Sequence, residues 1–236
     1  MHNRTLAAER SSGMSRPNIK RRYPIGAELI GDERAHFRIW APKADRLEVA
    51  IDEKFHELER EPDGYFSGEA EAKAGTLYRF RLNGEENLYP DPASRFQPEG
   101  PHGPSCVVDH RAFKWTDDRW KGTTLPGHIM YEMHIGTFTP EGTWRAAAEK
   151  LPLLKDDGVT LLEMMPIADF PGKFGWGYDG VNLFAPCRLY GSPDDLRFFI
   201  DRAHAIGLAV ILDVVYNHFG PDGNYLGVFS DDYVHR

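Results

Sequence analysis

The pattern of apolar and polar positions changes its character near the middle of the chain. Residues 23–110 contain short alternating segments at 36–40, 47–51 and 76–82, and such alternation is typical of strands with one buried face. Turn-forming pairs such as Asn83-Gly84 separate these segments. Because no long amphipathic helix interrupts the stretch, it predicts a small immunoglobulin-like β-sandwich.

From residue 127 onward the pattern predicts strands that alternate with helices. Apolar segments at 128–134, 159–164 and 208–215 indicate strands, and residues 143–156 and 193–206 have helical periodicity. Ser192, Pro193 and Gly207 are the N-cap, first-turn and terminating residues expected of the second helix. This order of about three β/α units fits an open doubly wound sheet or a TIM (β/α)8 barrel.

These patterns predict four segments along the 236 residues. Residues 1–22 are polar and basic and are expected to form a disordered tail. Residues 23–110 are expected to form the sandwich, which is similar to a carbohydrate-binding module, and residues 111–126 form a connector. Residues 127–236 are expected to form the first part of an incomplete barrel.

Charge and cysteine content narrow the class of protein. The formal net charge is −8, although the first 22 residues hold six basic residues and one acidic residue. An acidic body repels phosphate and anionic lipid, which disfavours nucleic acid and membrane as partners. The only cysteines, Cys106 and Cys187, have no framework spacing, and the chain has no signal-peptide pattern. We therefore expect unpaired thiols and a cytoplasmic location.

The candidate chemistry lies where the predicted parallel strands end, because function gathers there in α/β folds. Asp213 and His218 follow the third strand, and the long loop 166–191 after the second strand is rich in aromatic residues. These rings could form a wall for a sugar or pack on the rim of the fold. Asp213 could be structural or catalytic, and His218 could simply bond a neighbour. No nucleotide, cofactor or serine-nucleophile motif follows any predicted strand.

Four longer motifs resemble those of a known family. The string DVVYNH at 213–218 resembles the first signature of the alpha-amylase superfamily, and FRIWAP at 37–42 resembles the sandwich that precedes the barrel in several members. Within that superfamily, YEMHIGTFTPEGTW from Tyr131 and GWGYDGVNLFAP from Gly175 are most similar to malto-oligosyltrehalose trehalohydrolases. The resemblance implies retaining hydrolysis of the α-1,4 bond next to the terminal trehalose of malto-oligosyltrehalose or a related α-glucan.

The resemblance also implies roles for individual side chains. Tyr178 matches an aromatic residue that stacks on the sugar, His218 matches a histidine that hydrogen-bonds that sugar, and Asp213 matches a supporting aspartate. Asn217 matches a calcium ligand of true amylases, but trehalohydrolases generally lack this ion, so we expect no metal and no cofactor. The expected substrate-binding residues are Tyr178, His218, Trp176, Asp179 and Asn217.

The chain departs from the family in its catalytic carboxylates. A retaining glycosidase needs a nucleophile and an acid/base about 5 to 5.5 Å apart, and in this family they follow the fourth and fifth barrel strands. We therefore expect this chain alone to be inactive, and we disfavour Glu132, Glu163, Asp179 or Asp213 as substitutes. The alternatives are a fragment of a glycogen branching enzyme, which is an α-1,4-glucan transferase, and a non-catalytic α-glucan-binding protein.

Overall fold

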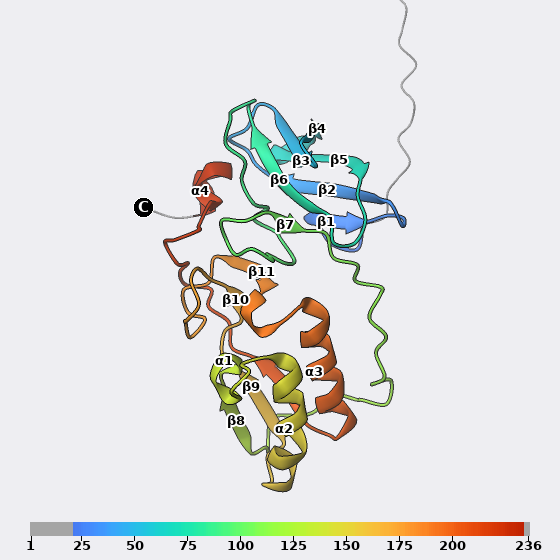
Figure 1. Cartoon of the computed structure of the whole chain (residues 1–236), viewed down its shortest axis with the longest axis vertical. Coiled ribbons are helices and arrows are strands. Elements are labelled where there is room, and N and C mark those ends of the chain that lie inside the picture. Colours follow the sequence, from blue (N-terminus) through green and yellow to red (C-terminus); the bar gives the residue numbers. More distant parts are fainter. Residues whose placement is uncertain (1–20, 234–236) are drawn as a thin grey trace, which may run out of the picture.

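A computed structural model describes residues 21–233 and places an antiparallel sheet domain beside an α/β part (Figure 1). The strands of the sheet domain are β1 (Gly26–Leu29), β2 (Arg34–Trp40), β3 (Leu47–Ile51), β4 (Lys54–Arg60), β5 (Tyr65–Glu71), β6 (Leu77–Leu82) and β7 (Ser105–Cys106), with a short η1 turn at Pro62–Gly64. The predicted antiparallel domain is thereby confirmed.

The sheet domain forms two packed layers from one hydrogen-bonded sheet. Its strand order is β1-β2-β5-β4-β3-β6-β7. Phe37 on β2 and Tyr78 on β6 are far apart in this order, yet their ring centroids lie 5.0 Å apart in the buried core. The contact therefore crosses between layers. Strand β4 joins them, since it pairs with β3 along its length and with β5 at Glu59 and Arg60.

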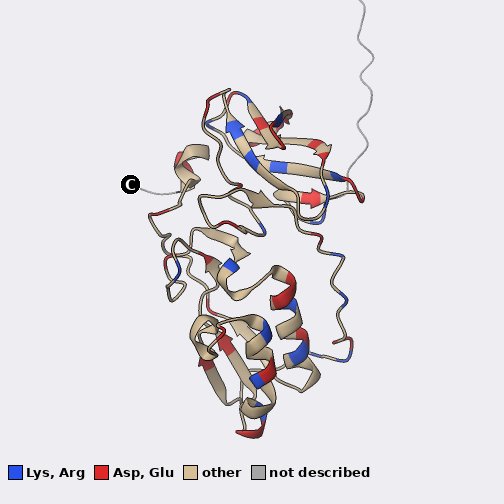
Figure 2. Ribbon diagram, in the orientation of Figure 1, with Lys and Arg blue, Asp and Glu red and all other residues tan. Residues whose placement is uncertain are grey.

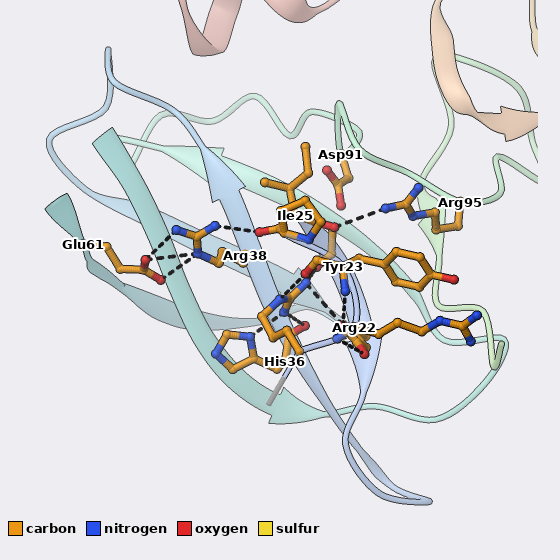
Figure 3. Close-up of polar contacts among 12 residues, drawn as sticks. Arg22, Tyr23, Ile25, His36, Arg38, Glu61, Asp91 and Arg95 are labelled. Carbon is orange, nitrogen blue, oxygen red and sulfur yellow. Dashed lines mark hydrogen bonds and ion pairs between the residues drawn. The ribbon is translucent and has the colours of Figure 1, made fainter. Parts of the chain in front are cut away.

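The start of the described chain is bound to the first two strands. The Arg21 guanidinium donates to the carbonyl oxygens of His36 at 2.9 Å and Gly26 at 2.6 Å. The Arg22 backbone N–H donates to Glu28 Oε1 at 2.8 Å, and Figure 3 shows these contacts among their polar neighbours. Residues 1–20 of the predicted tail lie outside the described residues, whereas its last two belong to the sheet domain.

The α/β part contains three parallel strands in the order β12-β9-β8. This order follows the chain, as expected for the start of a barrel, and the prediction of β/α units is confirmed. The strands are shorter than predicted. The elements are β8 (Met130–Met133), α1 (Ile135–Phe138), α2 (Trp144–Asp156), β9 (Leu161–Met164), β10 (Ala168–Asp169), β11 (Asn182–Pro186), η2 (Arg188–Tyr190), α3 (Pro193–Ala205) and β12 (Ala209–Leu212).

The two long helices cover one face of this sheet. Helix α3 begins with a capping box, in which Ser192 Oγ accepts from the Asp195 N–H and the Asp195 carboxylate accepts from the Ser192 N–H. The rings of Trp144 on α2 and Phe199 on α3 lie 5.4 Å apart. Both are fully buried with Leu162 of β9 in one core cluster, so the helical periodicity predicted for both segments is confirmed.

The last described segment returns to the sheet domain. Helix α4 (Leu226–Phe229) and the turn η3 (Asp231–Tyr233) lie beside that domain and not beside the parallel strands (Figure 1). Phe229 has 0 % of its surface exposed and belongs to the same core cluster as Phe37. Residues 226–233 therefore pack on the sheet domain, and the predicted bounds of the barrel segment, 127–236, stay a prediction.

Charged residues are mixed over both parts of the molecule. Acidic and basic positions alternate along α3 and are interspersed on the antiparallel sheet (Figure 2). Both cysteines are free, as predicted. Within residues 21–233, no helix combines the length and the apolar character needed to cross a bilayer.

Candidate functional site

The candidate site begins where β12 ends. The Asp213 backbone N–H donates to the Met164 carbonyl oxygen at 2.8 Å, which fixes the residue beside the end of β9. The Tyr178 hydroxyl, from the long loop that follows β9, donates to Asp213 Oδ2 at 3.1 Å. Two residues 35 positions apart thus meet at the carboxyl ends of neighbouring strands, as the sequence predicts.

His218 completes this cluster from the loop after β12. Its Nε2 lies 2.9 Å from the Tyr178 carbonyl oxygen, and because a carbonyl can only accept, Nε2 carries the hydrogen. Asn217 Oδ1 lies 3.2 Å from His218 Nδ1. The structure therefore brings together Tyr178, Asp213, Asn217 and His218.

Negative charge surrounds the Tyr178 hydroxyl. The hydrogen bond to Asp213 is the main reason why the pKa of Tyr178 is raised, with smaller contributions from burial, Glu132 and Glu163. Glu132 on β8 and Glu163 on β9 are register partners. Leu162 and Met164 of β9 pack in the core with the helices, so the alternation of side chains along a strand puts both glutamates side by side on the opposite face of the sheet. Both carboxylates favour the neutral phenol because a phenolate would add a like charge.

The sequence leaves open whether the aromatic residues of this loop face a sugar or pack against the fold, and the structure contains rings of both kinds. Phe170 is 3 % exposed and packs in the core of the α/β part. Phe174 is 95 % exposed, Trp176 is 73 % exposed and Tyr178 is 37 % exposed. One ring therefore supports the fold, whereas the rings at 174–178 remain accessible to a ligand.

Two anchors hold the exposed part of this loop. His134 Nε2 donates to the Gly175 carbonyl oxygen at 2.9 Å and also lies 2.9 Å from the Tyr190 hydroxyl. The Arg188 guanidinium donates to Asp169 Oδ1 and to the Phe170 carbonyl oxygen, both at 2.9 Å. The position of His134 at a strand end marks it in the sequence, whereas nothing local marks Arg188 or Tyr190.

The other two predicted site residues are Trp176 and Asp179, near Tyr178 in the sequence, and their side chains make fewer contacts. No side-chain hydrogen bond or ion pair joins Trp176 or Asp179 to another residue of the described chain. The Asp179 backbone is nevertheless important, because a Cβ at Gly220 would lie 2.2 Å from its carbonyl oxygen. The loop after β12 therefore packs directly on the backbone next to Tyr178.

An apolar cavity of about 360 Å³ lies beside Asp213. Its walls come from the loop after β9, the start of α3 and the end of β12, and they include Pro166, Leu183, Phe184, Leu196, Leu212 and Tyr216. Among residues 21–233 no group of three His, Cys, Asp or Glu side chains is arranged to hold a metal ion. The absence of a metal remains a prediction from the sequence.

Comparison with known proteins gives a family match that includes these strand ends. The model of "Alpha amylase, catalytic domain" matches residues 94–231. A protein of Salmonella typhimurium assigned to the alpha amylases has a solved structure with a TM-score of 0.86 and 46 % identity, over 90 % of this chain and 36 % of that chain. The match extends over the sheet domain as well as the α/β part.

Two curated relatives bear on the activity. The malto-oligosyltrehalose trehalohydrolase of Deinococcus radiodurans is 47 % identical over 205 residues, which are 87 % of this chain and 34 % of the relative. A 1,4-alpha-glucan branching enzyme of Rhodospirillum rubrum is 34 % identical over 227 residues, or 85 % of this chain and 30 % of that enzyme. The chain spans about a third of the length of these relatives.

Proposed function

The chain belongs to the alpha-amylase family, and from this membership we propose that it is the substrate-holding part of a retaining α-glycosidase that releases trehalose from malto-oligosyltrehalose. The observation that carries the proposal is the cluster of Tyr178, Asp213 and His218 at the strand ends. The greater identity to a trehalohydrolase than to a branching enzyme supports this choice of reaction.

In this proposal the Tyr178 ring is a platform for one glucose unit. Pyranoses present apolar faces that pack on aromatic rings, and the hydrogen bond to Asp213 fixes the ring at 3.1 Å from that carboxylate. Trp176, 73 % exposed and two residues away, extends the apolar surface for a second unit. Asp179 and Asn217 offer polar groups at the margin of this surface for sugar hydroxyls.

His218 and Asp213 supply the polar contacts of the platform. Because His218 Nε2 is occupied by the Tyr178 carbonyl, a sugar hydroxyl would be bound through Nδ1, in exchange for the weak contact to Asn217 at 3.2 Å. Asp213 Oδ2 accepts from Tyr178, and its second oxygen remains to accept from a ligand hydroxyl. Asp213 is thus a supporting group and not the nucleophile.

We assign the cleavage itself to carboxylates outside these 236 residues. A retaining mechanism needs one nucleophile and one proton donor on opposite sides of the glycosidic bond. Glu132 and Glu163 lie side by side on adjacent strands, and we do not assign them this role, because the pair in the family follows the fourth and fifth barrel strands. On this proposal the chain binds the substrate but does not release trehalose, and it acts in the cytoplasm without a cofactor.

The proposal can be tested by comparing the affinity of the chain for two ligands. Maltotriosyltrehalose and maltopentaose contain the same number of glucose units, but only the first ends in trehalose. Calorimetric titration of the chain should give a lower Kd for maltotriosyltrehalose. Equal affinity would favour a general α-glucan-binding protein, and new α-1,6 branches made by a protein that contains this chain would establish the branching enzyme.

A further inference from the structure

We infer that the antiparallel sheet domain positions the sugar-binding loop of the α/β part, through a clamp formed by His102, Asp222 and Tyr225. The inference depends on the proposed function only where it predicts a change in ligand affinity. It assigns a task to the sheet domain other than binding a glycan itself. The loop concerned is 213–225, which carries Asp213 and His218 at one end and two of the three clamp residues at the other.

The His102 ring bonds two residues of the loop at once. His102 Nε2 lies 2.9 Å from Asp222 Oδ1, and Nδ1 lies 2.7 Å from the Tyr225 hydroxyl. The carboxylate accepts, so Nε2 carries a hydrogen, and the tyrosine hydroxyl then donates to Nδ1 in the neutral ring. Both ring nitrogens are thereby engaged, which fixes the imidazole in one orientation.

His102 belongs to the segment between β6 and β7, which are two strands of the antiparallel sheet. The segment is held firmly, because the buried Gln97 side chain donates to the carbonyl oxygens of Gly100 and Gly103 at 3.2 and 3.3 Å. In Figure 1 this segment lies between the sheet domain and the α/β part. His102 therefore presents a fixed bonding group to the loop.

The backbone of the loop packs closely against the same segment. A Cβ at Gly223, where φ is +79°, would lie 2.6 Å from Pro101 Cβ. Only glycine meets both the left-handed conformation and the close approach without strain. Directly after the clamp, Phe229 is buried in the sheet-domain core, so the chain cannot move away from this surface without exposing that ring.

The other end of the same loop contacts the sugar platform. The Gly220 N–H donates to the Gly180 carbonyl oxygen at 3.3 Å, and His218 is bound to the Tyr178 carbonyl oxygen. The clamp residue Asp222 is only four positions from His218. A loop fixed at Asp222 and Tyr225 has few ways to displace His218, and this limits the ordering cost when a ligand binds.

Hydrogen exchange of the backbone amides tests the clamp without any ligand. The Gly220 N–H is bound to the Gly180 carbonyl oxygen, and in His102→Ala and Asp222→Ala its exchange should be about fivefold faster, as expected for the loss of one to two net hydrogen bonds. Asp222→Asn should keep the protection, because the amide oxygen still accepts from Nε2. The matched control is His56→Ala, since His56 lies on β4 and lines a different cleft with Glu33 and Lys73.

The amides of β9 (Leu161–Met164) provide the internal reference. Faster exchange in the loop with unchanged exchange in β9 supports the inference. Unchanged exchange in the loop of His102→Ala would overturn it, and so would an equal rise in β9, which indicates global destabilisation. His102→Ala should then bind maltotriosyltrehalose about threefold more weakly than the wild type does. The affinity of Asp222→Asn should change little. If the wild-type chain binds no glucan, the proposed function fails while the exchange result still decides the clamp.

Discussion

The hydroxyl of Tyr178 donates a 3.1 Å hydrogen bond to Oδ2 of Asp213, and this contact raises the pKa of the tyrosine. Asp213→Asn removes the negative charge that opposes a phenolate, so the pKa of Tyr178 should fall toward its ordinary value. The change can be followed by NMR titration with ¹³C-labelled tyrosine. An unchanged Tyr178 titration would show that the two side chains do not meet in solution.

Phe229 should be a main contributor to the stability of the sheet domain. Its side chain is fully buried with Phe37 and Phe66, and truncation of such a ring costs about 3 to 5 kcal/mol. Phe229→Ala should lower the free energy of unfolding in urea by that amount. Phe174→Ala, at a ring that is 95 % exposed, should change it by less than about 0.5 kcal/mol. An equal loss of stability in the two variants would contradict the burial of Phe229 in this core.

His110 should make stability depend on pH. Burial, followed by the charge of Arg197, lowers the pKa of His110 from 6.5 to about 4. Between these values the unfolded chain binds a proton that the folded chain does not, so stability falls as the pH decreases from 6.5 to 4. Because the ring is partly exposed, we expect a loss of about 1 to 2 kcal/mol.

The measurement for His110 is the free energy of unfolding at several pH values in the wild type and in His110→Gln. The variant should lose less stability below pH 6.5, since it has no ring to protonate. His56→Gln is the control, because His56 lies in a separate cleft on β4. Parallel pH curves for the wild type and His110→Gln would contradict the account.

Arg188 should support the aromatic loop through Asp169. The Asp169 side chain has 0 % exposure, and burial raises its pKa even though Arg188 opposes that shift. Arg188→Ala leaves a buried carboxylate without its cation, which costs about 3 to 5 kcal/mol. Asp169→Asn in the same background should recover part of this loss in urea unfolding. If the double variant Arg188→Ala, Asp169→Asn were no more stable than Arg188→Ala, the lost ion pair would not be the cause of the loss in stability.

The sequence predicts that Asp213 and Tyr178 meet, because their positions follow from strand topology. Asp213 ends an apolar strand and Tyr178 lies in a long loop after the preceding strand, and parallel strands bring such positions to one edge. The capping box at Ser192 and Asp195 is equally local and was predicted at its N-cap residue. Local patterns thus determine the order of elements and the general place of the site.

The contacts between the two parts of the molecule could not be predicted in this way. Phe229 lies in a short apolar segment, and no pattern there indicates whether it enters the near core or a core formed more than a hundred residues earlier. The bond between His102 and Asp222 spans 120 positions, and neither residue lies in a regular element with a periodic signal. Such pairings depend on how the finished domains meet.

The most direct test of the proposed site is calorimetric binding of maltotriosyltrehalose to single variants. Tyr178→Phe keeps the stacking ring and should retain most of the affinity, whereas Tyr178→Ala and Trp176→Ala should each weaken binding by about 1 to 2 kcal/mol. Trp115→Ala is the matched control, because Trp115 is also exposed, at 43 %, and lies in the connector. Undiminished affinity in Tyr178→Ala and Trp176→Ala would contradict a sugar platform at the ends of these strands.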